Sequence, residues 1–301
     1  MKKFIYKILQ LALGMAIIDQ VYGYAINQLR LKVAGGTVGK NMYVCDSVKS
    51  DVLIFGSSRA RMGYDPVIIG DSLKMSCYNC GENGMGIIFD YARMKVITHR
   101  YMPKMVIIDV LPILYIMKRD DDIIFLNEMR PWYNVDGVDS VFWKVDNTER
   151  YKMLSKMYCY HSKFLDYILN LHSKIPSNGY DPAPSSKIIS DCELNQKEPT
   201  DNVEDPLKMY YLERFIKDYR NKTKLVFVVS PRYNFKTSKT VDPLRKLCNK
   251  YHILLLDHYA DPKFVHDRSL HGDGNHFNEK GATLFSQTIS KEIKCSCEVK
   301  R

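Results

Sequence analysis

Five short, largely apolar runs recur along the chain. They cover residues 51–55, 75–79, 104–110, 224–230 and 252–257. Uninterrupted runs of this length are typical of strands that are buried on both faces, as in a parallel sheet. Stretches with helical periodicity lie between and after them, at 85–99, 206–220, 238–250 and 279–294. This alternation predicts a three-layer α/β/α domain with a parallel sheet and right-handed crossovers, covering residues 50–301.

The last of these helical stretches carries the clearest pattern. Ala282, Phe285, Ile289 and Ile293 recur at helical spacing, and Asn278 stands where an N-cap residue belongs. We therefore expect a helix that begins just after Asn278 and buries this stripe.

The alternation breaks between residues 115 and 204. This segment is too long for a simple loop, so we expect a mostly helical insert that caps the sheet. Within it, residues 148–172 read as one long helix and residues 174–186, rich in Pro, Gly and Ser, as a loop. Aromatic side chains of the insert could stack on sugar rings, although their spacing favours the core of the cap. They are Trp132, Tyr133, Phe142, Trp143, Tyr158 and Tyr160.

Residues 1–30 have the pattern of a membrane anchor or a signal segment. Three lysines flank the start of a run that is apolar from Ile8 to Ile18, and the stretch Phe4–Ile26 is close to the ~20 residues that cross a bilayer. This length and the flanking charge favour an uncleaved signal-anchor. A signal peptide cleaved near Ala25 and an amphipathic helix are the alternatives, because Asp19 is costly within hydrocarbon.

The lysines also predict where the chain resides. With them retained on the inner side, the rest of the protein lies outside the cytoplasm, anchored to the membrane or, after cleavage, secreted. A linker at residues 32–49, which contains Gly35, Gly36 and Gly39, is expected to join the two parts.

The amino-acid composition and net charge indicate which classes of binding partner the protein could have. The chain has 301 residues, 46% hydrophobic and 26% charged, which is ordinary for a globular protein. A formal charge of +10 suggests attraction to anionic partners such as lipid headgroups or acidic glycans. The lysines and arginines are scattered along the chain. The sequence contains neither a zinc-finger motif nor an aromatic-basic RNA-binding motif, so no nucleic-acid partner is predicted.

Eight cysteines are too few for a disulfide scaffold, and we expect most of them to be small core side chains. Cys77-x-x-Cys80 and Cys295-x-Cys297 could be half-sites for zinc, but the first lies in a strand-to-loop passage, the second lies in the last seven residues, and structural zinc sites usually show two clean paired half-sites. The His and Asp residues between His266 and His276 lack the tight spacing of a metal site. The sequence therefore predicts no metal and no other cofactor.

Two serines follow the first predicted strand directly, in the sequence Gly56-Ser57-Ser58. Functional residues of open α/β sheets gather at the carboxyl ends of the strands. A serine hydroxyl becomes an effective nucleophile when a base takes its proton and a third group orients that base. Asp273 and His276 lie between the last strand and the last helix, close enough for the carboxylate to reach Nδ1 while Nε2 points towards a serine. These residues predict a site of the serine-hydrolase type.

The same residues resemble the SGNH (GDSL-like) hydrolase superfamily. Its first block matches Gly56-Ser57-Ser58, and its last block, Asp-x-x-His, matches Asp273 and His276. The resemblance covers residues 51–114 and 223–293 and implies a flavodoxin-like fold. It also implies that Ser58 is the nucleophile, His276 the base and Asp273 the residue that orients the imidazole.

The second and third blocks concern the oxyanion hole. The second block, an asparagine followed five positions later by a glycine, matches Asn79 and Gly84. It implies an oxyanion hole made by the backbone amides of Ser58 and Gly84. The third block departs from the family pattern, because residues 111–114 (LPIL) stand where the family has an asparagine that donates to the oxyanion. Loss of one such donor typically costs ~10²–10³ in rate.

The serine-serine-arginine opening and the missing asparagine resemble the branch related to bacterial cell-envelope and exopolysaccharide acetylation proteins. This resemblance implies a serine esterase or O-acyltransferase that acts on ester groups, above all O-acetyl groups, of a glycan outside the cytoplasm. Arg59 and Asn79 are the candidate substrate-binding residues. Arg59 and Arg61 could hold an anionic group of the substrate or pair with Asp65 or Asp71. A catalytically silent carbohydrate-binding or assembly protein and a lipid-directed esterase are the alternatives.

Overall fold

The computed structural model describes residues 1–118, 122–183, 203–235 and 239–298. Its centre is a sheet of five parallel strands. In sheet order they are β2 (Cys77–Asn79), β1 (Val52–Phe55), β3 (Met105–Asp109), β4 (Lys224–Val229) and β5 (Leu254–Asp257). Each strand lies within one of the five predicted runs, and the order 2-1-3-4-5 is flavodoxin-like. The predicted fold class is confirmed.

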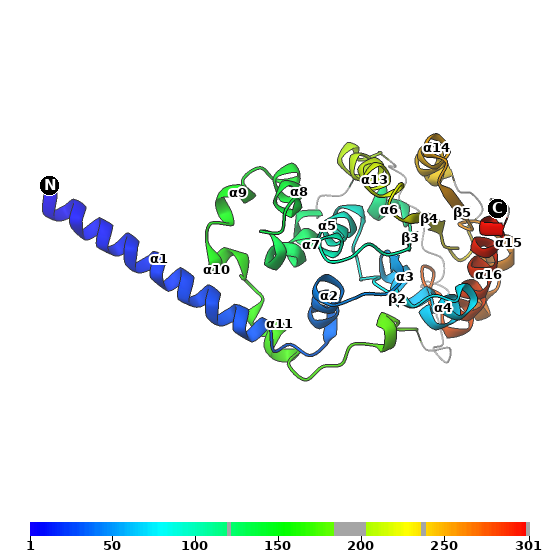
Figure 1. Ribbon diagram of the computed structural model, residues 1–301, viewed down its shortest axis with the longest axis horizontal. Helices are drawn as coiled ribbons and strands as arrows, with labels where there is room; N and C mark the ends of the chain where they lie inside the picture. Colours follow the sequence, from blue (N-terminus) through cyan, green and yellow to red (C-terminus); the bar gives the residue numbers. More distant parts are fainter. Residues whose placement is uncertain (119–121, 184–202, 236–238, 299–301) are drawn as a thin grey trace.

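Helices cover both faces of the sheet and give the molecule three layers (Figure 1). Side chains of β1 alternate between two cores, with Leu53 and Phe55 in one and Val52 and Ile54 in the other. The first core includes α2 (Gly36–Asp46), α5 (Ile87–Thr98), α13 (Pro206–Tyr219) and α14 (Asp242–Tyr251). The second includes α3 (Ser58–Gly63), α4 (Pro66–Leu73), α15 (Pro262–Val265) and α16 (Glu279–Glu298).

The last helix forms as its sequence predicts. Ala282, Phe285, Ile289 and Ile293 are fully buried in the second core. Asn278 Oδ1 accepts a hydrogen bond from the N–H of Gly281, which is the contact of an N-cap side chain. Short 3₁₀ segments, η3 (Lys239–Val241) and η4 (Arg268–Leu270), complete the connections around β5.

The linker predicted at residues 32–49 is wrong, because most of it is α2. Gly35 is extended at the start of this helix, and Gly36 adopts φ +65° beside the Asn170 side chain, where a Cβ would lie 1.9 Å from Oδ1. Val44 and Cys45 are fully buried in the first core. The glycines mark a tight helix start against the insert, which local composition does not distinguish from a flexible linker.

The insert is mostly helical, but the single helix predicted over 148–172 is wrong. Ser155 is extended and accepts the N–H of Tyr158 with its side chain, and Ser162 has φ +61°, so the chain turns at both positions. A short helix, α6 (Pro112–Tyr115), leads into the insert. Within the described part of the insert the short helices are α7 (Asp122–Leu126), η1 (Asn127–Trp132), α8 (Val138–Val145), α9 (Glu149–Lys152), α10 (Lys156–Cys159), α11 (Phe164–Leu169) and η2 (Ser177–Gly179).

The insert divides between the helices beside the sheet and a carboxyl-terminal part, η2 to Ala183, that lies at the ends of β2 and the last loop. Helices α7 and α8 pack against α5, while α10 and α11 pack against α1 (Lys2–Arg30) (Figure 1). Trp132, Phe142 and Tyr160 are buried, and the other aromatic side chains considered for sugar stacking are partly buried in the same clusters. The insert aromatics therefore form core, as their spacing favoured. Residues 184–186 of the predicted loop lie outside the described residues.

Helix α1 is long and apolar enough to cross a membrane. Its amino-terminal half projects away from the body, and its carboxyl-terminal half packs on the insert (Figure 1). Ile26 lies in a small core with Met153, Cys159 and Tyr167 of the insert.

Candidate active site

The first predicted site residue stands at the end of β1, where the chain turns sharply into α3. Gly56 adopts φ +144°, and a Cβ there would lie 2.6 Å from the Cβ of Ala60. Ser57 is fully buried and caps α3, because its Oγ accepts the N–H of Arg59. Ser58 is the first residue of α3 and is only partly buried. The two serines therefore differ in accessibility, and the Ser58 hydroxyl is the one directed at His276.

Ser58, His276 and Asp273 form a continuous hydrogen-bonded chain. Ser58 Oγ lies 2.7 Å from His276 Nε2. His276 Nδ1 lies 2.9 and 2.8 Å from the two carboxylate oxygens of Asp273. The structure thus brings together all three residues that the sequence analysis selected.

The environment of Asp273 favours its ionised form. Burial opposes ionisation, but the hydrogen bond and charge of His276 and the N–H groups of Asn275 and His276 outweigh it, so the pKa of Asp273 lies below its ordinary value. An ionised Asp273 can fix Nδ1 as a donor and leave Nε2 free to accept a proton.

The loop that carries His276 is held from a neighbouring strand. After β4, Arg232 Nε donates to Asn275 Oδ1 at 2.6 Å, and the N–H of Tyr233 donates to Gly274 O. Within the loop, the N–H of Gly272 donates to His276 O. These contacts hold the backbone of the loop that carries the His276 imidazole. Arg232 and Asn275 were not selected from the sequence, because neither residue is part of a recognisable motif.

Gly84 lies in the turn that follows β2. It adopts φ +72°, and a Cβ at this position would lie 2.9 Å from the Phe125 ring. Among the described residues, the N–H groups of Ser58 and Gly84 form no hydrogen bond. Two unpaired donors at this edge are compatible with the oxyanion hole that the resemblance implies.

An ion pair connects the serine helix to this turn. Arg61 of α3 lies 3.0 Å from Glu82, whose side chain is 2% exposed, and 2.7 Å from Asp181 of the insert. The N–H of Glu82 also donates to Gly56 O. Arg61 therefore pairs with carboxylates other than Asp65 and Asp71, and it couples α3 to both the glycine turn and the insert.

Lys40 of α2 supports the same turn from the opposite side. Its Nζ donates to Gly81 O at 2.5 Å and to Gly179 O at 2.8 Å, and its side chain is 1% exposed. Burial lowers the pKa of Lys40 to about 8. The sequence analysis placed this residue in a linker and so missed its contact with the site.

The two candidate substrate-binding residues are both buried. Asn79 is fully buried, and its amide donates to the carbonyls of Ala60 and Tyr64 while its Oδ1 accepts the N–H of Gly81. Arg59 donates to the carbonyls of Ser230 and Pro231. These contacts position the serine and glycine turns from inside the fold.

Asp109 ends β3, just before the position at which the family pattern has its asparagine. It is fully buried and accepts hydrogen bonds from Tyr64 Oη at 2.7 Å and from the N–H of Ser230 at 3.1 Å. The side chain therefore joins α3 to the end of β4 within the core.

No metal site is found in the part of the chain that the structure describes. His271, one of the residues considered for metal binding, is buried, and its Nε2 lies 3.0 Å from Phe264 O. Cys45, Cys77, Cys80, Cys159 and Cys248 are buried free thiols, as expected for small core side chains, whereas Cys295 is exposed.

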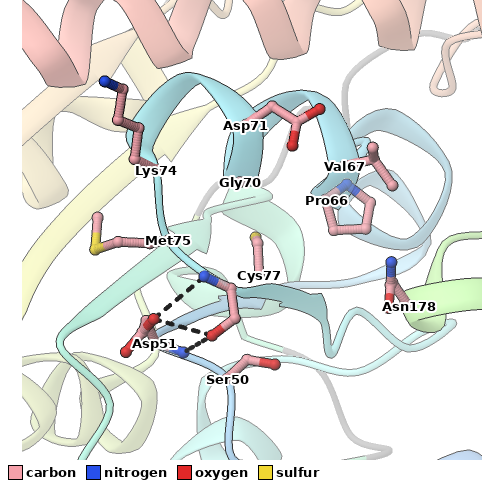
Figure 2. A pocket seen from close by; sticks show the side chains of 11 residues that line it. Ser50, Asp51, Pro66, Val67, Gly70, Asp71, Lys74, Met75, Cys77 and Asn178 are labelled. Atoms are coloured by element: carbon pink, nitrogen blue, oxygen red, sulfur yellow. Dashed lines mark hydrogen bonds between the residues drawn. The ribbon is translucent and has the colours of Figure 1, made fainter.

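A pocket of about 640 Å³ lies at the opposite edge of the sheet (Figure 2). Its walls include Ser50, Asp51 and Ser76, which precede β1 and β2, and residues of α4. Asp51 accepts hydrogen bonds from the N–H and hydroxyl of Ser76, so its carboxylate is already used within the wall. None of the predicted site residues lines this pocket.

Comparison with solved structures finds a distant similarity to several proteins. No family model and no curated protein matches the sequence. A structure described as a lipolytic protein of the G-D-S-L family from Desulfitobacterium hafniense is 12% identical, covers 80% of this chain and 97% of its own, and has a TM-score of 0.39. LAE5, described as an alpha/beta hydrolase enzyme from the metagenome of Lake Arreo, is 12% identical, with 84% and 98% covered and a TM-score of 0.42. A structure described as a GDSL-like lipase from Parabacteroides merdae is 13% identical, with 82% and 96% covered and a TM-score of 0.40.

Proposed function

We propose that this protein is a serine esterase or O-acyltransferase of the SGNH type. The observation that carries the proposal is the unbroken contact from Ser58 Oγ through His276 to the carboxylate of Asp273, with a short hydrogen bond at each step. A serine beside an oriented imidazole is the arrangement that turns a weak nucleophile into a reactive one.

The reaction follows from these positions. Ser58 Oγ attacks the ester carbonyl while His276 Nε2 takes its proton, and Asp273 stabilises the resulting imidazolium. The N–H groups of Ser58 and Gly84 hold the oxyanion of the tetrahedral intermediate. The intermediate then expels the alcohol, which receives the proton from His276, and an acyl-serine remains.

The acyl-serine is released by a second attack on its carbonyl. Water, activated by His276, yields a carboxylic acid, whereas a sugar hydroxyl yields a new ester; either reaction returns the proton to Ser58. The enzyme is an esterase in the first case and an acyltransferase in the second.

We propose an acylated glycan outside the cytoplasm as the substrate. The carboxyl-terminal half of α1 is built into a core with the insert, which favours retention of α1 as an anchor over cleavage near Ala25. Helix α3, which begins at Ser58, lies on the far side of the insert from the free half of α1 (Figure 1). A site held away from the anchor favours a glycan over a membrane lipid as the substrate.

The test is turnover of p-nitrophenyl acetate and of a long-chain p-nitrophenyl ester, together with labelling by a fluorophosphonate probe. We expect preference for acetate, an adduct on Ser58 in peptide mapping, and continued labelling of Ser57→Ala. A preference for the long-chain ester supports the lipid-directed alternative. Absence of both turnover and adduct in folded protein identifies the catalytically silent alternative.

A further inference from the structure

An acidic residue just past the middle of α1, Asp19, is bound by the insert. Ser155 Oγ donates to Asp19 Oδ1 at 2.6 Å, and the N–H groups of Lys156 and Met157 donate to the same carboxylate at 2.8 Å each. Gly23, one turn further along α1, lies against the side chain of Lys156, where a Cβ would be 2.4 Å from its Cβ. Helix α10 is therefore joined to α1 at residues 19–23.

This junction falls where α1 reaches the edge of a bilayer. From Lys2 to Asp19 a helix rises about 26 Å, close to the ~30 Å of a hydrocarbon core. Most side chains before Asp19 are apolar and exposed in the structure, so this half of α1 has no protein partner among the described residues. With α1 across the membrane, Asp19 and the start of α10 lie at the interface between lipid and water.

The part of the insert beside this junction presents apolar side chains to its surroundings. Tyr151, Leu154 and Met157, in and between α9 and α10, are all exposed. Among the described residues that follow α1, seven of the thirteen exposed large hydrophobic side chains lie between residues 151 and 169. This concentration exceeds what scattered surface residues explain.

Basic residues surround the three apolar side chains. Arg150 is exposed and lies over the Trp143 ring, Lys156 is partly buried against α1, and Lys152 is exposed but forms ion pairs with Asp146 and Glu149. Tyrosine and basic side chains are the types that settle at the level of lipid headgroups, where rings bury their apolar part and cations meet anionic lipid. The chemistry of this edge therefore matches a membrane surface.

We propose that Tyr151, Leu154 and Met157 form a rim that rests on the outer surface of the bilayer in which α1 is anchored. The rim and the Asp19 contact together hold the body of the protein at one orientation to the membrane. Because α3 lies beyond the insert from α1, this orientation keeps Ser58 away from the lipid and open to a glycan (Figure 1). The proposal rests on α1 being retained as an anchor, but not on the chemistry at Ser58.

Helix α11 supplies a matched control. Leu169 is exposed to the same 75% as Leu154, but α11 packs near the carboxyl-terminal end of α1, further from the free half (Figure 1). If exposure alone led to lipid contact, both positions would contact lipid. If the rim sets the orientation, Leu154 contacts lipid and Leu169 does not.

The experiment places the photo-reactive residue p-benzoylphenylalanine at position 13, 154 or 169 of the full-length protein. Each variant is reconstituted in vesicles of phosphatidylethanolamine and phosphatidylglycerol, irradiated, and analysed for lipid adducts by mass spectrometry. We expect adducts at positions 13 and 154, with on the order of tenfold more at 154 than at 169, since interfacial burial extends only ~5–10 Å into the boundary.

Each other outcome overturns the proposal in a recognisable way. Adducts at 13 with none at 154, or equal yields at 154 and 169, show that α1 is inserted but that the rim does not rest on lipid. Cross-linking of 154 to a second copy of the chain identifies a protein interface instead. Absence of adducts at 13 removes the anchor itself. Ester turnover of the same samples reports separately on the catalytic proposal.

Discussion

Ser58 Oγ and His276 Nε2 lie 2.7 Å apart, although 218 positions separate the two residues in the chain. The contact arises because β1 and β5 are parallel members of one sheet, so the segments that follow them emerge at the same edge. Arg59, next to the serine, binds the carbonyls of Ser230 and Pro231, and Arg232 binds Asn275 beside the histidine. One segment after β4 therefore holds both partners.

Substitutions in the Ser58–His276–Asp273 chain should act as one unit. We expect Ser58→Ala and His276→Ala each to remove nearly all esterase activity, and their combination to add little. Asp273→Asn should leave the fold intact but lower kcat by about 10⁴, because an amide stabilises the wrong imidazole tautomer. Steady-state kinetics of the four variants measure this. Additive losses, or full activity of Asp273→Asn, would contradict the assignment.

Gly84→Ala should lower esterase activity much more than Gly63→Ala does. Alanine there meets a strained φ of +72° and the Phe125 ring at 2.9 Å, so the turn must shift and carry its N–H away from the oxyanion. Loss of one oxyanion donor lowers kcat by ~10²–10³. Gly63→Ala is the control, because its Cβ would meet only an ordinary contact of 3.5 Å with Phe277. Equal kcat for the two variants would exclude Gly84 from the oxyanion hole.

Arg61→Met should lower kcat with a smaller effect on KM, because Arg61 positions the turn that holds Gly84 rather than the substrate. It also leaves the carboxylate of Glu82, which is 2% exposed, without its ion-pair partner, so the free energy of unfolding should fall by about 3–5 kcal/mol. Arg61→Lys should restore part of both. Arg214→Met removes an exposed ion pair with Asp218 on α13 and should change stability by less than ~1 kcal/mol. An unchanged kcat in folded Arg61→Met would show that this ion pair plays no part in positioning.

Asp90 should make stability fall as pH rises towards neutrality. Burial raises its pKa to about 7, against the favourable charge of Arg93 and a hydrogen bond from Tyr115. Because the unfolded chain ionises at the lower, ordinary pKa, this group stabilises the fold in acid and loses that contribution as pH rises through about 7. The slope reaches at most about −1.4 kcal/mol per pH unit.

Urea unfolding in detergent between pH 5 and 8 tests this behaviour. Asp90→Asn should flatten the decline while keeping an acceptor for Tyr115. Asp146→Asn is the control, because hydrogen bonds from Lys152 and Thr148 lower the pKa of Asp146 to about 2 and it does not titrate in this range. The same slope in wild type and Asp90→Asn would assign the decline to other groups.

Local pattern alone was enough to predict the sheet and most of its helices. Strands buried on both faces must be apolar throughout, and a helix with one buried face must repeat its apolar residues at helical spacing. Both patterns can therefore be recognised within a short stretch of sequence. Ala282 to Ile293 shows this directly. The Gly-Ser-Ser and Asp-x-x-His blocks were also readable, because each lies within a few residues and directly beside a predicted element.

Only the tertiary structure decided the features that depend on partners distant in sequence. The glycines of α2 are indistinguishable from a linker until Asn170 and the first core pack against them. The break at Ser155 is stabilised where the insert meets α1, because Asp19 accepts hydrogen bonds from donors 136 to 138 positions away. Asp109 is directed into the core by Tyr64 and Ser230. No repeating pattern in the sequence predicts such contacts. The energy of a buried polar group depends on which groups surround it in space and not on its neighbours in the chain.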